Sequence, residues 1–81
     1  MNNRVAVISI IVEDDRAVAT LNDLLHQYGQ YIIGRLGIPY HKKNVNIICV
    51  AIDAPNDSIN ALTGALGRLG GINAKATYAN V

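Results

Sequence analysis

Few side chains in this sequence have the chemistry that metal binding requires. None of the candidate ligands forms an HxH, CxxC or HxxxH pair. The histidine at position 41 is followed by Lys42 and Lys43, whose positive charges repel a cation. The candidates are two histidines, one cysteine and two adjacent carboxylates: His26, His41, Cys49, Asp14 and Asp15. We expect no metal site within one chain and no cofactor.

Nucleophilic catalysis also lacks its usual partners. Ser9 and Ser58 have no histidine within the same expected element. Gly64 and Gly67 fall inside an expected helix and do not form a phosphate-binding loop. The sequence therefore predicts that the protein is not an enzyme.

The polar residues of this sequence are more typical of a ligand-binding site than of a catalytic site. The stretch 13–16 lies at the start of an expected helix, where clefts can form between subunits. The candidate ligand-binding residues are Asp14, Asp15, Arg16, Arg35 and His41. Two alternatives remain open. The carboxylates could simply cap the helix, and His41 with Cys49 could form a metal-sensing site between subunits.

Composition limits the class of protein. The chain has 81 residues, enough for one domain spanning 1–81, and 51% of them are hydrophobic. The net charge of +1 gives no reason to expect a nucleic acid or an anionic membrane as a direct partner. The single cysteine is consistent with a reducing, cytoplasmic setting. No apolar run is long enough to span a bilayer.

The hydrophobic pattern alternates between the strand and helix periods. It predicts strands over 4–12, 30–38, 45–52 and 72–78, and helices over 15–28 and 57–69. The order βαββαβ with right-handed crossovers predicts an α+β, ferredoxin-like sandwich. Such a fold has a four-stranded antiparallel sheet with both helices on one face. Strands 4–12 and 45–52 are then central, because they are apolar on both faces.

Two helices can cover only one face of this sheet. We assign five residues to the covered face: Ile8, Ile10, Ile48, Val50 and Ile72. Six others then lie on the open face: Val5, Val7, Ile11, Ile33, Ile47 and Cys49. An apolar patch of this kind on a small protein favours self-association, so we expect a homodimer or homotetramer.

Several segments together resemble a known family. They are Ile10-Ile11-Val12-Glu13-Asp14, Leu24-Leu25-His26, Arg35-Leu36-Gly37-Ile38-Pro39 and, most specifically, the block 56–67 with its spacing NDxIxALxGxLG. The sequence is similar to the small regulators of the iron-only hydrogenase system over nearly its whole length. The resemblance implies an ACT-like domain, similar to the C-terminal domain of nickel-responsive regulators. It also implies a cytoplasmic regulatory protein that acts as a stand-alone homo-oligomer through a small-molecule effector or a protein partner.

Two departures limit what the resemblance implies. Nickel-responsive domains carry an HxH pair on the second strand, where this sequence has Arg35-Leu36-Gly37. ACT domains that bind amino acids usually have a glycine in the first strand-to-helix turn, and the stretch 13–17 has none. The sequence also lacks a ribbon-helix-helix or helix-turn-helix segment, so we expect no direct nucleic-acid binding.

Overall fold

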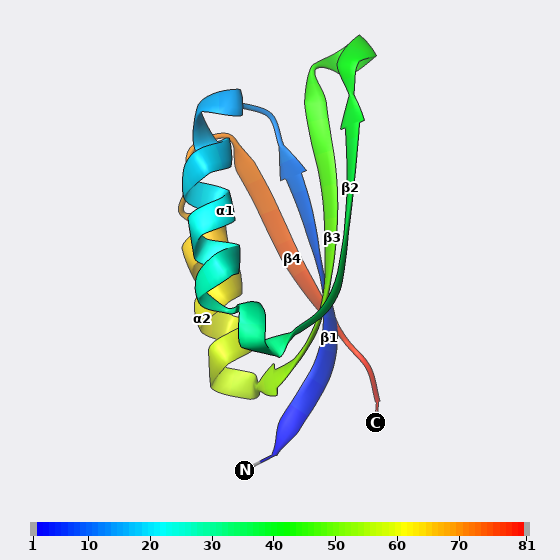
Figure 1. Cartoon of the computed structure of the whole chain (residues 1–81), viewed down its shortest axis with the longest axis vertical. Helices are drawn as coiled ribbons and strands as arrows, with labels where there is room; N and C mark the ends of the chain where they lie inside the picture. Colours follow the sequence, from blue (N-terminus) through cyan, green and yellow to red (C-terminus); the bar gives the residue numbers. More distant parts are fainter. Residues whose placement is uncertain (1, 81) are drawn as a thin grey trace.

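The computed structural model describes residues 2–80, which form one sheet with two helices packed against one of its faces (Figure 1). The strands are β1 (Asn3–Val12), β2 (Ile32–Tyr40), β3 (Val45–Pro55) and β4 (Ile72–Tyr78), and the helices are α1 (Val18–Gln27) and α2 (Asn56–Gly67). The strand order is β2-β3-β1-β4, and every neighbouring pair is antiparallel. The α+β, ferredoxin-like fold predicted from the sequence is confirmed.

Short 3₁₀ turns occupy three of the connections. They are η1 (Asp15–Ala17), η2 (Gly29–Tyr31) and η3 (His41–Lys43). The expected helix 15–28 is thus a 3₁₀ turn followed by α1. In η1 the Asp14 carboxylate accepts a 2.9 Å hydrogen bond from the Arg16 N–H, which is the capping role that the acidic stretch suggested.

The second strand differs most from the sequence-based prediction. It begins at Ile32 and continues through Pro39 to Tyr40, whereas the hydrophobic pattern predicts a strand over 30–38. An edge strand tolerates a proline because many of its N–H groups have no partner strand. The β2–β3 hairpin consequently extends the sheet beyond the helices (Figure 1). The molecule is elongated, with extents of 41 × 19 × 17 Å.

The core lies between the helices and the covered face of the sheet. Alternate residues of β1 and β3 point toward α1 and α2, because successive strand side chains point to opposite faces. The assignment of Ile8, Ile10, Ile48, Val50 and Ile72 to this face is confirmed, since all five are buried. The helices contribute Leu21, Leu25, Ile59, Leu62 and Leu66, each at most 2% exposed.

A bulge changes which residues of β2 face the helices. Ile32 pairs with Ile52 and Gly34 pairs with Ala51, so Ile33 is an additional residue in the strand. With Ile33 on the open face, as expected from the sequence, simple alternation would put Arg35 on that face too and Leu36 on the covered face. In the structure Arg35 is paired with Val50 on the covered face, whereas Leu36 and Cys49 pair on the open face.

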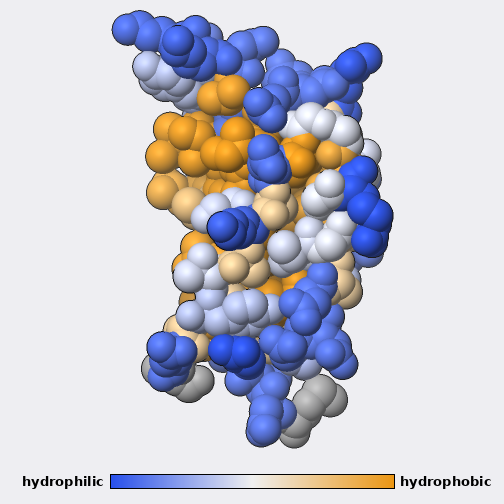
Figure 2. Space-filling model, turned by 180° about the vertical axis from the view of Figure 1, so that it is seen from behind, coloured by the Kyte–Doolittle hydropathy of each residue, from blue (hydrophilic) through white to orange (hydrophobic). Residues whose placement is uncertain are grey.

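The open face of the sheet is apolar on one side and polar on the other. One row across it runs from Asn73 through Ile11 and Ile47 to Ile38. Large apolar side chains are well exposed here, including Leu36 at 59% and Ile38 at 47%. Figure 2 shows hydrophobic residues gathered on the part of the surface where the β2–β3 hairpin lies. We call the side chains of Val7, Ile11, Leu36, Ile38, Tyr40, Val45, Ile47 and Cys49 the open-face patch.

Candidate ligand groove between α1 and the β2–β3 hairpin

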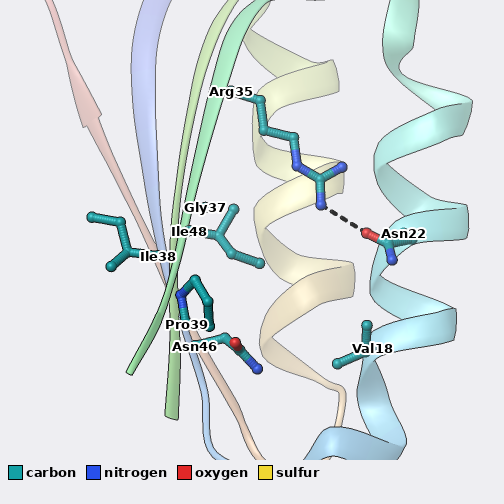
Figure 3. Close-up of a pocket in the computed structure, with 8 residues that line it drawn as sticks. All are labelled: Val18, Asn22, Arg35, Gly37, Ile38, Pro39, Asn46 and Ile48. Atoms are coloured by element: carbon teal, nitrogen blue, oxygen red, sulfur yellow. Dashed lines mark hydrogen bonds between the residues drawn. The ribbon is translucent and has the colours of Figure 1, made fainter. Parts of the chain in front are cut away.

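A groove of about 250 Å³ separates α1 from the projecting hairpin (Figure 3). It exists because the helices leave β2 largely exposed, including the face that its neighbouring strands bury. The helix supplies one turn of its surface, and the two strands supply the opposite wall. Its lining residues are Val18, Asn22, Arg35, Gly37, Ile38, Pro39, Asn46 and Ile48.

The bulge in β2 is what brings Arg35 into this groove. Beyond Ile33, the alternation of the strand places Arg35, Gly37 and Pro39 on the covered face. Arg35 then reaches α1, where its Nη2 donates a 2.7 Å hydrogen bond to Asn22 Oδ1 (Figure 3). Without the additional residue, the guanidinium would point toward the open face instead.

The groove combines one positive charge with amide groups and apolar walls. Among residues 2–80, Arg35 is the cationic residue of the lining and no carboxylate contributes to it. Asn22 and Asn46 add amides, which can both donate and accept hydrogen bonds. Val18 and Ile48 supply apolar surface from the helix and the sheet. This combination of charge, amides and apolar walls is compatible with a small anionic molecule that has an apolar part.

Sequence reasoning identified Arg35 but missed the two asparagines. An asparagine on a helix or strand gives no strong motif signal, because it usually faces solvent. The spacing of Val18 and Asn22 was the available signal, since residues four apart lie on one face of a helix.

The other predicted ligand residues do not join Arg35. Asp14 and Arg16 line a separate hollow beside Gly70, and Asp15 and His41 line a third one near the tip of the hairpin. Asn46 lines both the third hollow and the groove, so these two sites are neighbours. The five residues therefore occupy three hollows rather than one cleft in a single chain.

Asp14 and Arg16 neutralise one another. Arg16 Nη2 lies 2.8 Å from Asp14 Oδ2, and Arg16 Nε donates to both carboxylate oxygens. The hydrogen bonds from the Arg16 side chain, followed by the bond from its main-chain N–H, lower the pKa of Asp14. The Asp14 carboxylate therefore accepts hydrogen bonds from the turn and from the Arg16 side chain. Fewer donors and acceptors of these two residues are then available to a ligand.

The alternative metal site does not form within one subunit. Within residues 2–80, no three His, Cys, Asp or Glu side chains come together as a set of ligands. His41 is in η3 at the tip of the hairpin, whereas Cys49 lies within β3. Val45, at the start of β3, is already about 13 Å from Cys49 at roughly 3.3 Å per strand residue. A site between subunits stays a prediction.

Comparisons with known proteins agree with this fold. The chain matches, over residues 4–76, the family model TM1266-like, described as "Iron-only hydrogenase system regulator, putative". The protein belongs to this family. A search of curated proteins gave no match. No helix among the described residues has both the length and the apolar character needed to cross a bilayer.

Comparison with solved structures also supports this fold. Protein TM1266 from Thermotoga maritima is 31% identical, with a TM-score of 0.94 over 98% of this chain and 100% of that chain. A formyltetrahydrofolate deformylase from Pseudomonas putida KT2440 is similar over 95% of this chain but 29% of its own, with 12% identity and a TM-score of 0.68. A nitrogen regulatory PII-like protein from Thiomonas intermedia K12 has 15% identity and a TM-score of 0.55 over 99% of this chain and 100% of its own. The last two show a shared fold alone.

Proposed function

We propose that the protein is a stand-alone, ACT-like regulatory module of an iron-only hydrogenase system, and that it works as a homo-oligomer without catalysing a reaction. In this proposal it responds to a small-molecule effector or a protein partner. The family description supports the regulatory role. The observation that carries the assembly is the open-face patch, where Leu36 and Ile38 expose about half of their surface.

The patch favours a second copy of the chain as its cover. Large, contiguous apolar areas are uncommon on monomeric soluble proteins and mark interaction sites. The patch extends to the free edge of β2, whereas Asn73, Lys75 and Thr77 of β4 make the other side of the same face polar. A two-fold partner can therefore meet the β2–β3 side of one sheet with the same side of its own.

An effector can act by changing the population of assemblies. A ligand shifts an equilibrium only when it binds one state better than another. The groove and the patch lie on opposite faces of the same two strands, β2 and β3, and Ile38 borders both, with its side chain on the open face (Figure 3). An occupied groove would therefore bias the position of the hairpin that carries the patch.

The assembly can be tested with two matched substitutions in one row of the open face. Ile38→Asp introduces a charge at the β2 end of the row, and Asn73→Asp introduces the same charge at the β4 end. We expect the wild-type chain and Asn73→Asp to be oligomers by native mass spectrometry and light scattering, and Ile38→Asp to dissociate. A wild-type monomer at high concentration would contradict the proposal.

A further inference from the structure

We propose that the groove between α1 and the β2–β3 hairpin binds a small organic monocarboxylate, with the carboxylate on Arg35 and the apolar tail between Val18 and Ile48. The inference deepens the proposed function by giving the chemical class of the effector. Its regulatory meaning rests on that function, but the binding event itself does not.

The charge argument begins with a comparison of two arginines. Arg16 has its own carboxylate, Asp14, at 2.8 Å. Arg35 has an amide oxygen, Asn22 Oδ1, at 2.7 Å, and within residues 2–80 no carboxylate forms an ion pair with it. A guanidinium has five N–H donors in a fixed fork that matches a carboxylate. The bond to Asn22 uses one donor, orients the fork and leaves the others for a ligand.

The amide of Asn22, next to Arg35, favours the same anion. Asn22 Oδ1 already accepts from Arg35, so the Asn22 amino group is a second donor at the same end of the groove. Asn46 lies farther along the groove, beside Pro39, and is not part of this pair of donors (Figure 3). A carboxylate held by Arg35 and the Asn22 amino group receives charge-assisted hydrogen bonds, which are stronger than bonds between neutral groups.

The size and walls of the groove limit the rest of the molecule. Its volume of about 250 Å³ is below the range of roughly 300–1,000 Å³ that is typical for drug-sized ligands. Val18, Ile48 and Pro39 form apolar walls for a short tail. Gly37 has no side chain, and a Cβ built there meets no atom within 4 Å, so the room beside it is open.

The lining also selects against related ligands. Within residues 2–80 no carboxylate lines the groove, so the ammonium group of an amino acid would lie near the Arg35 guanidinium with no negative charge to balance the two. Inorganic phosphate carries more charge than one guanidinium compensates, and it has no apolar part. A plain carboxylic acid with a short branched or aromatic tail fits both the charge and the walls.

The experiment is an NMR titration of the full-length, ¹⁵N-labelled protein with matched small molecules. The probes are 4-methylpentanoate and phenylacetate, up to about 20 mM, which saturates a site with a millimolar Kd. We expect shifts at the amides of Val18, Asn22 and Gly37. The neutral 4-methylpentanamide, the amino acid leucine and inorganic phosphate should each bind at least about tenfold more weakly, because each lacks or misplaces a charge-assisted bond.

Three variants locate the binding. Arg35→Gln should weaken binding of 4-methylpentanoate at least about tenfold, by loss of the charged fork. Gly37→Val should abolish it by filling the groove. Gly34→Val is the matched control, because Gly34 is on the same strand, pairs with Ala51 toward the open face and also has open space around it. It should bind like the wild type.

The proposal is overturned by any of six results. They are no shift with either acid, equal affinity for the amide, for leucine or for phosphate, and unchanged affinity in Arg35→Gln or in Gly37→Val. The well-dispersed spectrum of each variant establishes that it is folded. The mass of the oligomer is measured separately, so failure of carboxylate binding and failure of the assembly give different results.

Discussion

Gly71 lies directly against Asp14, and its carbonyl accepts a 2.7 Å hydrogen bond from the N–H of Glu13. The contact joins the end of β1 to the turn before β4. Gly71 has a φ of 78°, in the left-handed region, and a Cβ there would collide with Asp14 Cβ. The turn that carries the acidic stretch is thus positioned by a glycine nearly sixty residues away in sequence.

We expect Gly71→Ala to destabilise the protein by about 2 kcal/mol or more. Both the backbone conformation and the collision with Asp14 oppose an added methyl group. Urea denaturation measures the change in the free energy of unfolding. Gly70→Ala is the control, because a Cβ at Gly70 meets nothing within 4 Å, and it should be neutral or stabilising by up to about 1 kcal/mol. Equal effects of the two substitutions would contradict the structure.

The ion pair between Asp14 and Arg16 should be visible in the titration of the carboxylate. Arg16 lowers the pKa of Asp14 in the folded state. The ion pair therefore stabilises the fold at a pH above the pKa that Asp14 has in the unfolded chain. This stabilisation is lost as the pH falls through the lower pKa that Asp14 has in the folded state. NMR titration should give a midpoint below the ordinary value, which returns toward it in Arg16→Ala. Arg4→Ala, near the start of β1, should leave the midpoint unchanged.

Gly37→Val should not weaken the fold even though it fills the groove. Glycine within a strand costs conformational entropy, and valine has a high β propensity. Since a side chain at Gly37 meets open space, we expect a gain of up to about 1 kcal/mol in the free energy of unfolding. Thermal and urea unfolding measure it. A clear loss of stability would show that the groove is narrower than described.

Two leucine substitutions separate the core from the open-face patch. Leu62 is fully buried, so Leu62→Ala should cost about 2–5 kcal/mol at any protein concentration. Leu36 is 59% exposed in one chain, so Leu36→Ala should have a small effect on the isolated subunit. If the patch is covered in an oligomer, the loss of stability caused by Leu36→Ala should grow with protein concentration, because assembly then stabilises the wild-type chain more than the variant. Melting curves over a concentration series distinguish the two, and a concentration-independent loss for Leu36→Ala would argue against assembly through this face.

The strands and the covered face were predictable because the central strands carry long apolar runs. Ile8, Ile10 and Val50 follow the period of two from end to end, and each is buried. The helices were also predictable in position, although the first begins as a 3₁₀ turn. These features depend on the hydrophobic pattern of each segment, which can be read directly from the sequence.

The groove was not predictable, because it depends on one additional residue in β2. Alternation through Ile33 misplaced Arg35 and left Leu36 and Ile38 off the open face. Gly34 and Gly37 indicated a bend or a bulge in this strand, but which residue is the additional one follows from pairing with β3. Asn22 acquires its role only through contact with Arg35, thirteen positions away.

The projecting hairpin also affects how the molecule diffuses. With a long axis of 41 Å against 19 and 17 Å, one chain experiences more friction than a sphere of equal mass. It would leave a gel-filtration column early and resemble a heavier particle. Elution volume alone would therefore overstate the number of subunits, so stoichiometry has to come from scattering or from mass itself.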